Sequence, residues 1–206
     1  YNFVPVYWMA TEDHDFDEIS YFNLFGKKYQ WETDQKGAVG KFNTASISEI
    51  LDAMPEESPI FKNAYNNASC LAEAVRTYVN ALFGEEGLLV IDPDDKGLKS
   101  LFAKEISSDL FEHLPQQQAI RNSDKLEKLG YKNQVFPREI NFFYMKGNVR
   151  ERIEKHGDTF QVLNTDISFS EAEMHKLIAE EPEVFSPNVI LRPVFQETIL
   201  PNLAYV

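Results

Sequence analysis

One order of segments occurs twice in this chain: a short apolar run, an acidic loop and then a helical pattern. It covers residues 3–20 and again residues 88–112. Strands that alternate with helices favour a parallel sheet, because the connection between two parallel strands has to cross one face of the sheet. The sequence therefore predicts an α/β fold with a parallel sheet at its core.

Helical patterns fill most of the space between these two repeats. Ser46-Ile-Ser-Glu49 has the residues of a capping box and predicts a short helix that ends before Pro55. Apolar residues spaced by three and four predict one long helix from Ser58 to Leu82. Cys70 would then lie in the middle of this helix, as a small packing residue.

Two antiparallel parts are also predicted. Residues 28–31 and 38–42 flank the polar turn Asp34–Gly37 and are typical of a hairpin. Residues 121–155 hold nine Lys and Arg against five Asp and Glu, in a chain that is otherwise acidic. Short strands at 134–136, 141–145, 149–153 and 160–163 would form an antiparallel arm in this part of the chain, followed by a helix that opens on the capping box Ser170–Glu173.

This pattern divides the chain into three parts. Residues 1–120 form part of the α/β core, with a helical and hairpin insertion over about residues 26–86. Residues 121–168 form an antiparallel β insertion, and residues 169–206 form a helix and a return to the core. Both ends of the chain lie in apolar runs, so we expect it to be a piece of a longer protein.

The charge balance excludes several classes of partner. The chain has 20 Lys and Arg against 33 Asp and Glu, a formal net charge of −13. Such a chain repels phosphate backbones and anionic lipid surfaces, so we expect neither nucleic acid nor a membrane as partner. The single cysteine, Cys70, has no internal disulfide partner and indicates a reducing compartment.

The strongest candidate for chemistry is Thr11-Glu12-Asp13-His14-Asp15, which directly follows the first apolar run. Ligands of open α/β sheets bind at the carboxyl ends of strands. Clustered carboxylates there can hold Mg²⁺, receive an amine cation or orient the imidazole as a general base. The alternative is that Asp13 or Asp15 only caps the next helix.

A weaker copy of this pattern follows the second strand. Asp92, Asp94 and Asp95 precede a helical segment, and an ordinary helix N-terminus explains them equally well. If the two strands are neighbours in one sheet, the two acidic loops would face the same crevice.

Charged and polar residues later in the chain are candidates for anion binding. Arg138, Glu139 and Asn141 lie between Phe136-Pro137 and an aromatic strand, and an arginine there suits a carboxylate or a phosphate. Arg192 and Gln196 lie in a similar apolar setting. An ion pair within the protein is the alternative for Arg138 and Glu139. A helix end or an ion pair explains Arg192 and Gln196 equally well. The histidines lack metal-ligand spacing, so no metal site is predicted, and the sequence has no glycine-rich phosphate loop.

Three longer segments resemble one known family. They are Val4–Phe16, Phe136–Tyr144 and Phe185–Val206, the last with Asn188, Arg192, Gln196 and Leu200-Pro201. In order and spacing they are similar to the bacillithiol-synthesis cysteine-adding enzymes, the BshC family, and the resemblance covers essentially the whole chain.

The resemblance implies a cytoplasmic bacterial ligase with a Rossmann-like core, interrupted by connecting segments and followed by a coiled coil through which a homodimer would form. The reaction it implies is the last step of bacillithiol synthesis, which joins cysteine to glucosaminyl-malate. The implied cofactor is ATP, either alone or together with Mg²⁺. The family's N-terminal segment and coiled coil have no counterpart in this sequence, so we expect the chain alone to be inactive.

Within this family, the acidic cluster is the predicted catalytic centre, with Asp92 and Asp94 as secondary candidates. The catalytic residues are Glu12, Asp13, His14 and Asp15, and the substrate-binding residues are Trp8, Arg138, Glu139, Asn141, Asn188, Arg192 and Gln196. The alternative function is a non-catalytic substrate-binding or scaffold portion of such an enzyme. A metal-dependent hydrolase is a third and weaker hypothesis.

Overall fold

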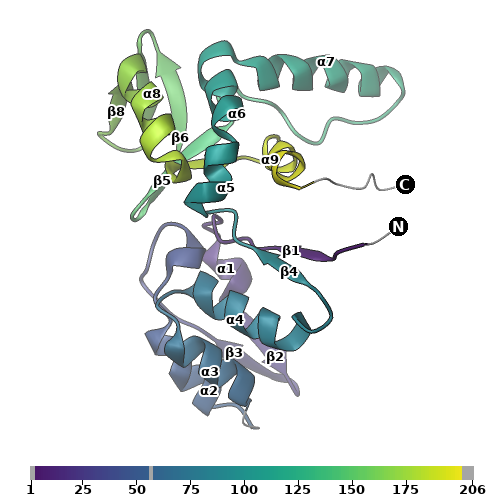
Figure 1. Cartoon of the computed structure of the whole chain (residues 1–206), viewed down its shortest axis with the longest axis vertical. Helices are drawn as coiled ribbons and strands as arrows, with labels where there is room; N and C mark the ends of the chain where they lie inside the picture. Colours follow the sequence, from purple (N-terminus) through teal and green to yellow (C-terminus); the bar gives the residue numbers. More distant parts are fainter. Residues whose placement is uncertain (1–2, 56–57, 201–206) are drawn as a thin grey trace. The chain divides into compact units, whose positions relative to one another are not determined.

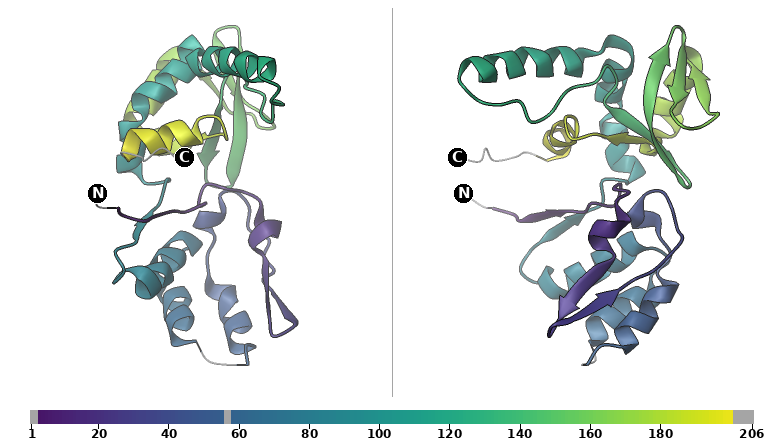
Figure 2. Two further views of the ribbon diagram at one scale, coloured as in Figure 1. Left: turned by 90° about the vertical axis from the view of Figure 1, so that its right-hand side faces the viewer. Right: turned by 180° about the vertical axis from the view of Figure 1, so that it is seen from behind.

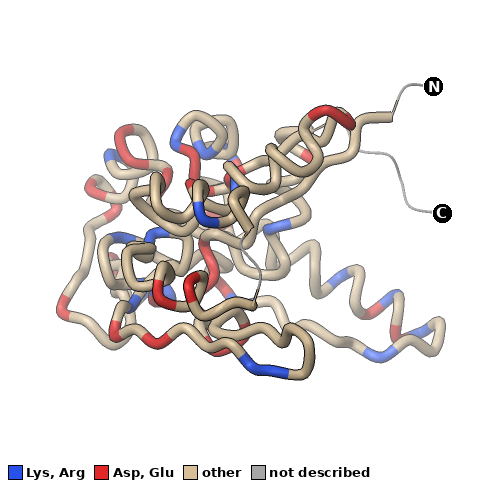
Figure 3. Tube along the Cα trace, turned by 90° about the horizontal axis from the view of Figure 1, so that it is seen from below, with Lys and Arg blue, Asp and Glu red and all other residues tan. Residues whose placement is uncertain are grey.

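The computed structural model describes residues 3–55 and 58–200 (Figure 1). The chain divides between Pro93 and Asp94 into two compact units. Both contain helices and strands, and within the described residues no helix is long and apolar enough to cross a membrane. Acidic residues occur along the whole trace, whereas the helix over residues 114–128 carries interspersed basic and acidic residues (Figure 3).

The first unit contains the predicted parallel strands. β1 (Val6–Trp8) pairs with β4 (Leu89–Ile91), with Tyr7 opposite Val90. The pairing continues one residue further, where the amide of Met9 donates to the carbonyl of Ile91 at 3.0 Å. The α/β prediction is therefore confirmed, and the strands that precede the two acidic loops are neighbours.

A hairpin is present in this unit, but not where the sequence predicts it. β2 (Tyr21–Leu24) pairs with β3 (Lys27–Gln30). Phe25 and Gly26 both have positive φ, as the tightest two-residue hairpin turns require. The prediction of paired strands at 28–31 and 38–42 is wrong, because residues 28–30 pair backwards with β2 and Val39–Lys41 form a 3₁₀ turn, η1.

The long helix predicted after Ser58 is two helices, α3 (Pro59–Asn67) and α4 (Leu71–Phe83). The Thr44 hydroxyl contacts the carbonyls of Tyr65 and Ala68, at 3.1 and 3.2 Å, and the Leu71 amide donates to the Phe42 carbonyl at 2.8 Å. These bonds to a distant segment occupy the backbone where one helix would have continued. Cys70 is consequently the residue before α4 and not a residue inside a helix.

The capping box predicted at Ser46 is also absent. The Ser46 hydroxyl accepts a hydrogen bond from the indole Nε1 of Trp31 at 2.7 Å. The segment starts as a 3₁₀ turn, η2 (Ala45–Ile47), and continues as α2 (Ser48–Asp52) without a side-chain cap. Trp31 belongs to the buried core of the unit, which also contains Val39, Phe42, Ile47 and Leu51. The Ser46 hydroxyl, which the local pattern assigns to a helix cap, therefore bonds a core side chain instead.

The second unit begins with a broken helical segment: α5 (Lys96–Leu101), α6 (Ala103–Ser107) and a π-helical turn, η3 (Ser108–Glu112). The Asp95 carboxylate caps α5 by accepting from the amide of Leu98 at 3.0 Å. A further helix, α7 (Leu114–Lys128), was not predicted. Residues 129–141 connect α7 to the sheet without forming a strand (Figure 1). The prediction of a strand at 134–136 is therefore wrong.

The sheet of the second unit has five antiparallel strands in the order β8-β7-β6-β5-β9. They are β5 (Phe142–Lys146), β6 (Val149–His156), β7 (Thr159–Val162), β8 (Ser168–Ser170) and β9 (Phe185–Pro187). β5, β6 and β7 match the three remaining strands predicted for the arm. β8 and β9 extend the sheet on either side, and β9 is followed by α9 (Arg192–Ile199).

The second predicted capping box is present and begins α8 (Glu171–Glu180), which packs against the β7–β8 end of the sheet (Figure 2). The Ser170 hydroxyl accepts from the Glu173 amide, and the Glu173 carboxylate accepts from the Ser170 amide at 2.7 Å. Hydrogen bonds that the Ser170 amide and then the Ser170 hydroxyl donate to the Glu173 carboxylate lower the pKa of this carboxyl. α8 leads through the 3₁₀ turn η4 (Pro182–Val184) into β9.

The core of the second unit is aromatic and contains one lysine. Phe102 lies 4.7 Å from Phe195 and 6.0 Å from Phe142, between ring centroids. Lys99, on α5, is completely buried among them. Its Nζ donates to the carbonyl of Phe185 at 2.5 Å and lies 5.2 Å from the centroid of the Phe195 ring. The bonded ammonium group therefore ties α5 to β9.

Candidate functional site

The carboxyl ends of β1 and β4 lie side by side, and a hydrogen bond joins the two loops that follow them. The Thr11 hydroxyl donates to Oδ1 of Asp92 at 2.5 Å. The structure therefore brings the first acidic loop together with the first residue of the second one. We call residues 11–15 together with Asp92 the acidic strand end.

The four predicted catalytic residues differ in exposure. Glu12 is buried, with 4% of its surface accessible, whereas His14 and Asp15 are exposed. His14 Nδ1 lies 3.8 Å from Oδ1 of Asp13. Asp15 occupies the position before helix α1 (Phe16–Ile19), but its side chain makes no capping hydrogen bond. The acidic strand end therefore presents an exposed imidazole beside a carboxylate, and helix capping does not account for Asp15.

Gly40 holds the acidic strand end against η1. Its amide donates to the Thr11 carbonyl at 2.9 Å, and the Val39 amide donates to the Asp13 carbonyl at 2.7 Å. A Cβ atom on Gly40 would lie 2.5 Å from the Cβ of Thr11 and 2.7 Å from its carbonyl oxygen. Only glycine allows this approach without displacing the backbone of Thr11.

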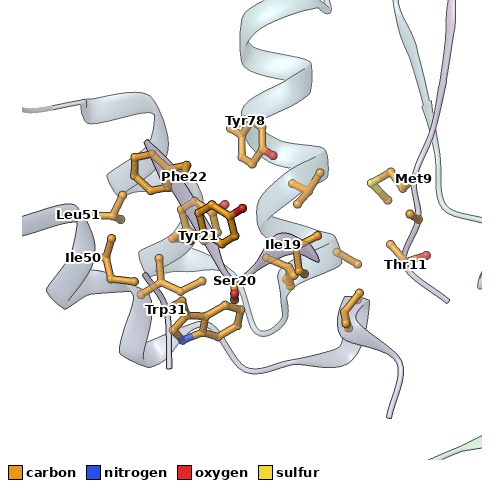
Figure 4. Close-up of a pocket in the computed structure, with 18 of the residues that line it drawn as sticks. Met9, Thr11, Ile19, Ser20, Tyr21, Phe22, Trp31, Ile50, Leu51 and Tyr78 are labelled. Atoms are coloured by element: carbon orange, nitrogen blue, oxygen red, sulfur yellow. The ribbon is translucent and has the colours of Figure 1, made fainter. Parts of the chain in front are cut away.

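A cavity of about 290 Å³ opens beside Thr11 in the same unit (Figure 4). Met9 and Thr11 lie at one side of it, and Trp31, Ile50 and Leu51 lie at the other. Five tyrosines contribute to its lining: Tyr7, Tyr21, Tyr29, Tyr65 and Tyr78. We call it the tyrosine cavity. Its mostly apolar wall and few hydroxyl groups are typical of a small-molecule site.

Two of these tyrosines come from the facing helices α3 and α4. The ring centroids of Tyr65 and Tyr78 are 6.0 Å apart. Burial raises the pKa of the Tyr65 phenol, and the neighbouring Tyr78 adds to this rise; burial likewise raises the pKa of Tyr78. Both phenols therefore stay protonated at neutral pH, so the cavity offers hydroxyl groups and not phenolate charges.

In the second unit, three of the predicted substrate-binding residues line one pocket of about 170 Å³: Arg138, Asn141 and Asn188. Arg152, which the sequence did not single out, also lines it. The other lining residues are apolar: Val135, Phe136, Ile140, Phe142, Phe143 and Val189. We call this the arginine pocket.

Asn141 connects the segments that form the arginine pocket. Its Oδ1 accepts from the Arg138 amide at 3.1 Å and from Nδ2 of Asn188 at 3.0 Å. Its Nδ2 donates to the Arg138 carbonyl at 2.8 Å and to Oδ1 of Asp109 at 2.9 Å. A side-chain amide has two donor hydrogens and two acceptor sites, so the capacity of Asn141 is fully used within the protein. We therefore assign Asn141 a positioning role.

Asp109, in η3, is the buried carboxylate behind this connection. It accepts from the Asn141 amide at 2.5 Å as well as from the side chain. Burial raises its pKa to about 6, although the hydrogen bonds from Asn141 act in the opposite direction. Sequence reasoning missed Asp109; the available signal was an aspartate on the apolar helical face that carries Ile106 and Leu110.

The remaining predicted residues do not line either cavity. Glu139 lies close to His113, at 3.2 Å between Oε1 and Nε2. Trp8 is half-buried in β1, Arg192 and Gln196 lie in α9, and Asp94 precedes α5. Across residues 3–55 and 58–200, no group of three His, Cys, Asp or Glu side chains is arranged to hold a metal ion.

Comparison with known proteins decides the family. The profile described as "Bacillithiol biosynthesis BshC, N-terminal Rossmann-like domain" matches residues 1–206, the whole chain. The chain belongs to the BshC family. The resemblance seen in the sequence and the Rossmann-like fold class are thereby confirmed.

Relatives in this family carry the name "Putative cysteine ligase BshC". The protein of Cytophaga hutchinsonii is 51% identical over 99% of this chain and 39% of its own length. That of Flavobacterium psychrophilum is 46% identical over 100% of this chain and 40% of its own length. That of Natranaerobius thermophilus is 30% identical over 100% of this chain and 41% of its own length. This BshC chain thus spans about two fifths of these relatives.

Proposed function

We propose that this chain is part of a ligase that adds cysteine to glucosaminyl-malate in the last step of bacillithiol synthesis, with the acidic strand end as its catalytic centre. The observation that carries this assignment is the hydrogen bond from Thr11 to Asp92 at the carboxyl ends of two parallel strands. It joins the two acidic loops where α/β sheets bind ligands. The family description and the relatives' names support a cysteine ligase of bacillithiol biosynthesis. The substrate glucosaminyl-malate and the place of the step in the synthesis are proposed on the sequence resemblance.

Amide formation sets clear demands on such a site. The amine of one substrate has to lose a proton before or while its nitrogen attacks the carboxyl carbon of the other. The exposed His14 imidazole would accept this proton, and Asp13, 3.8 Å away, would stabilise the imidazolium that forms. The exposed Asp15 would attract the ammonium group before deprotonation. The tyrosine cavity beside Thr11 would receive the rest of a substrate.

ATP and Mg²⁺ are proposed on the family resemblance alone. Activation of a carboxylate for amide formation needs a leaving group, which ATP supplies when it is bound. The sequence has neither a G-x-x-x-x-G-K nor a G-x-G-x-x-G loop, so it offers no recognised glycine-rich cradle for a triphosphate. No step of the proposed mechanism is therefore assigned to the nucleotide.

The proposed substrates are small molecules, and we propose a cytoplasmic location and a homodimer through a coiled coil on the same resemblance. A second candidate function is a substrate-binding portion without catalytic residues. The mostly apolar tyrosine cavity favours this alternative, because it offers binding surface and few reactive groups.

The test uses the full-length gene of this protein in a bacillithiol-producing strain from which the resident ligase has been deleted. His14→Ala and Asp13→Asn are expected to abolish bacillithiol and to cause glucosaminyl-malate to accumulate. His156→Ala and Asp158→Asn, at an exposed hairpin turn of the second unit, serve as matched controls and should restore bacillithiol. Full complementation by both site variants would reject the catalytic centre and favour the substrate-binding alternative.

A further inference from the structure

The arginine pocket carries two positively charged side chains that no carboxylate within residues 3–55 and 58–200 neutralises. Arg138 and Arg152 both line it, from the loop before β5 and from β6. Among the residues that the structure describes, no carboxylate pairs with either guanidinium group. In a chain with net charge −13, two arginines without an acidic partner at one pocket are unexpected.

A neighbouring arginine shows the contrast. Arg150, two residues before Arg152 on β6, lies with its guanidinium carbon 4.1 Å from the centroid of the Phe143 ring. Its Nη2 also donates to the Ser186 hydroxyl at 3.4 Å. Phe143 is at the same time the direct cross-strand partner of Arg152. Arg150 is thus held by the sheet, whereas the guanidinium of Arg152 is left for a ligand.

The nearby acidic groups are engaged elsewhere. Glu139 pairs with His113, Glu151 accepts a hydrogen bond from Asn164 at 3.1 Å, and Asp109 accepts one from the pocket residue Asn141 at 2.9 Å. The Asn141 side chain bonds both the backbone amide and the backbone carbonyl of Arg138, and so fixes the loop on which Arg138 lies. The pocket therefore has a fixed floor and cationic side chains, the arrangement that recognises oxyanions.

The rim of the pocket is apolar and exposed. Phe136 has 77% of its surface accessible and Val189 has 60%. Exposed large apolar side chains around a polar site often mark a binding surface, because a ligand covers them. The pocket, at about 170 Å³, is smaller than the sites that enclose drug-sized ligands, so it fits a small molecule or one end of a larger one.

We propose that the arginine pocket binds a small organic anion by its carboxylate or phosphate group. Arg138 and Arg152 would hold the oxyanion, and the apolar part of the ligand would lie against Phe136 and Val189. The proposal concerns binding in the second unit only, and it stands or falls independently of the ligase reaction proposed for the acidic strand end.

The test is an NMR titration of the isotope-labelled full chain with three probes. Phenyl phosphate and benzoate present one ring with either oxyanion and so separate phosphate from carboxylate recognition, whereas inorganic phosphate lacks the ring. We expect saturable shifts confined to residues 135–143, 152 and 188–189, with tighter binding of at least one aromatic probe than of inorganic phosphate.

Arg138→Gln and Arg152→Gln should each weaken binding of the preferred probe about tenfold or more, as expected for the loss of a charge-assisted hydrogen bond. Arg121→Gln, an exposed arginine on α7, is the matched control and should leave the affinity unchanged. Shifts outside the pocket, or unchanged affinity in both pocket variants, would overturn the proposal. Equal binding of inorganic phosphate and phenyl phosphate would overturn the role of the apolar rim.

Discussion

At the scale of single residues, long-range contacts decide the roles of polar side chains. Asp109 and Ser46 are the clearest cases. Ser46 has the local pattern of a helix cap but bonds the indole of Trp31, and Asp109 has no local motif but supports Asn141 from 32 positions away. Neither partner is visible from sequence spacing, because each depends on how distant segments pack.

We predict that Asp109 makes the stability of the second unit depend on pH. Its folded-state pKa, about 6, is above the ordinary 3.8, so the folded chain binds this proton more tightly. The free energy of unfolding should therefore rise as the pH falls through 6, by about 2.5 kcal/mol between pH 7 and pH 4. Denaturant titrations between pH 4 and 7 should show this rise in the parent chain and a flatter profile in Asp109→Asn. Parallel profiles would contradict the prediction.

Gly40→Ala should damage the acidic strand end. The new methyl group would meet Thr11 at 2.5–2.8 Å, so Thr11 or η1 must shift, and such a shift would disturb the hydrogen bond of Thr11 to Asp92. We expect the free energy of unfolding to fall by about 1–3 kcal/mol, as for other overpacked sites. Thr11→Val is the companion variant, because it keeps the shape and removes the hydrogen bond. Thermal melting and bacillithiol formation together measure the effect. A Gly40→Ala variant with the melting temperature and bacillithiol formation of the parent would show that η1 can move aside without cost.

At the scale of helices and strands, the sequence predicts those elements whose start and end depend on residues close in the chain. The capping box at Ser170 and the strands β5 to β7 with their turns follow from local residues, and the structure contains them. The break between α3 and α4 follows instead from bonds of Thr44 and Phe42 to the later segment. Of the candidate site, the loops and Arg138 were predictable, whereas Asp109, Arg152 and the tyrosine cavity arise only from the packing.

Ser170→Ala should destabilise the second unit by about 1 kcal/mol, because it removes the hydroxyl that accepts from the first turn of α8. Ser100→Ala is the matched control: its exposed hydroxyl donates to the Lys96 carbonyl inside α5 and caps nothing. Urea denaturation of both variants measures the difference. Equal loss in the two variants would mean that the capping box contributes no more than an ordinary helical serine.

At the scale of the whole molecule, the parallel pair β1–β4 leaves apolar surface exposed. Phe3, Val4 and Leu89 are half or more accessible. Parallel strands are usually covered on both faces, so bare apolar side chains here favour association.

We therefore expect the 206-residue chain to self-associate in solution. Val4→Lys combined with Leu89→Lys should shift sedimentation velocity profiles toward the monomer, because two buried lysines would oppose the contact. Leu129→Lys, at a still more exposed leucine that directly follows α7, is the control and should leave the profile unchanged. A monomeric parent chain at high concentration would contradict the prediction.

The rate at which the buried ammonium group of Lys99 reacts can report how often the second unit opens locally. Amine-reactive reagents modify exposed lysines quickly, but they cannot reach a side chain with no accessible surface whose Nζ is bonded to a main-chain carbonyl. Acylation of Lys99 therefore has to wait for α5 to separate from β9. Its rate of modification, read by mass spectrometry against that of exposed Lys176, would measure how often this part of the molecule opens.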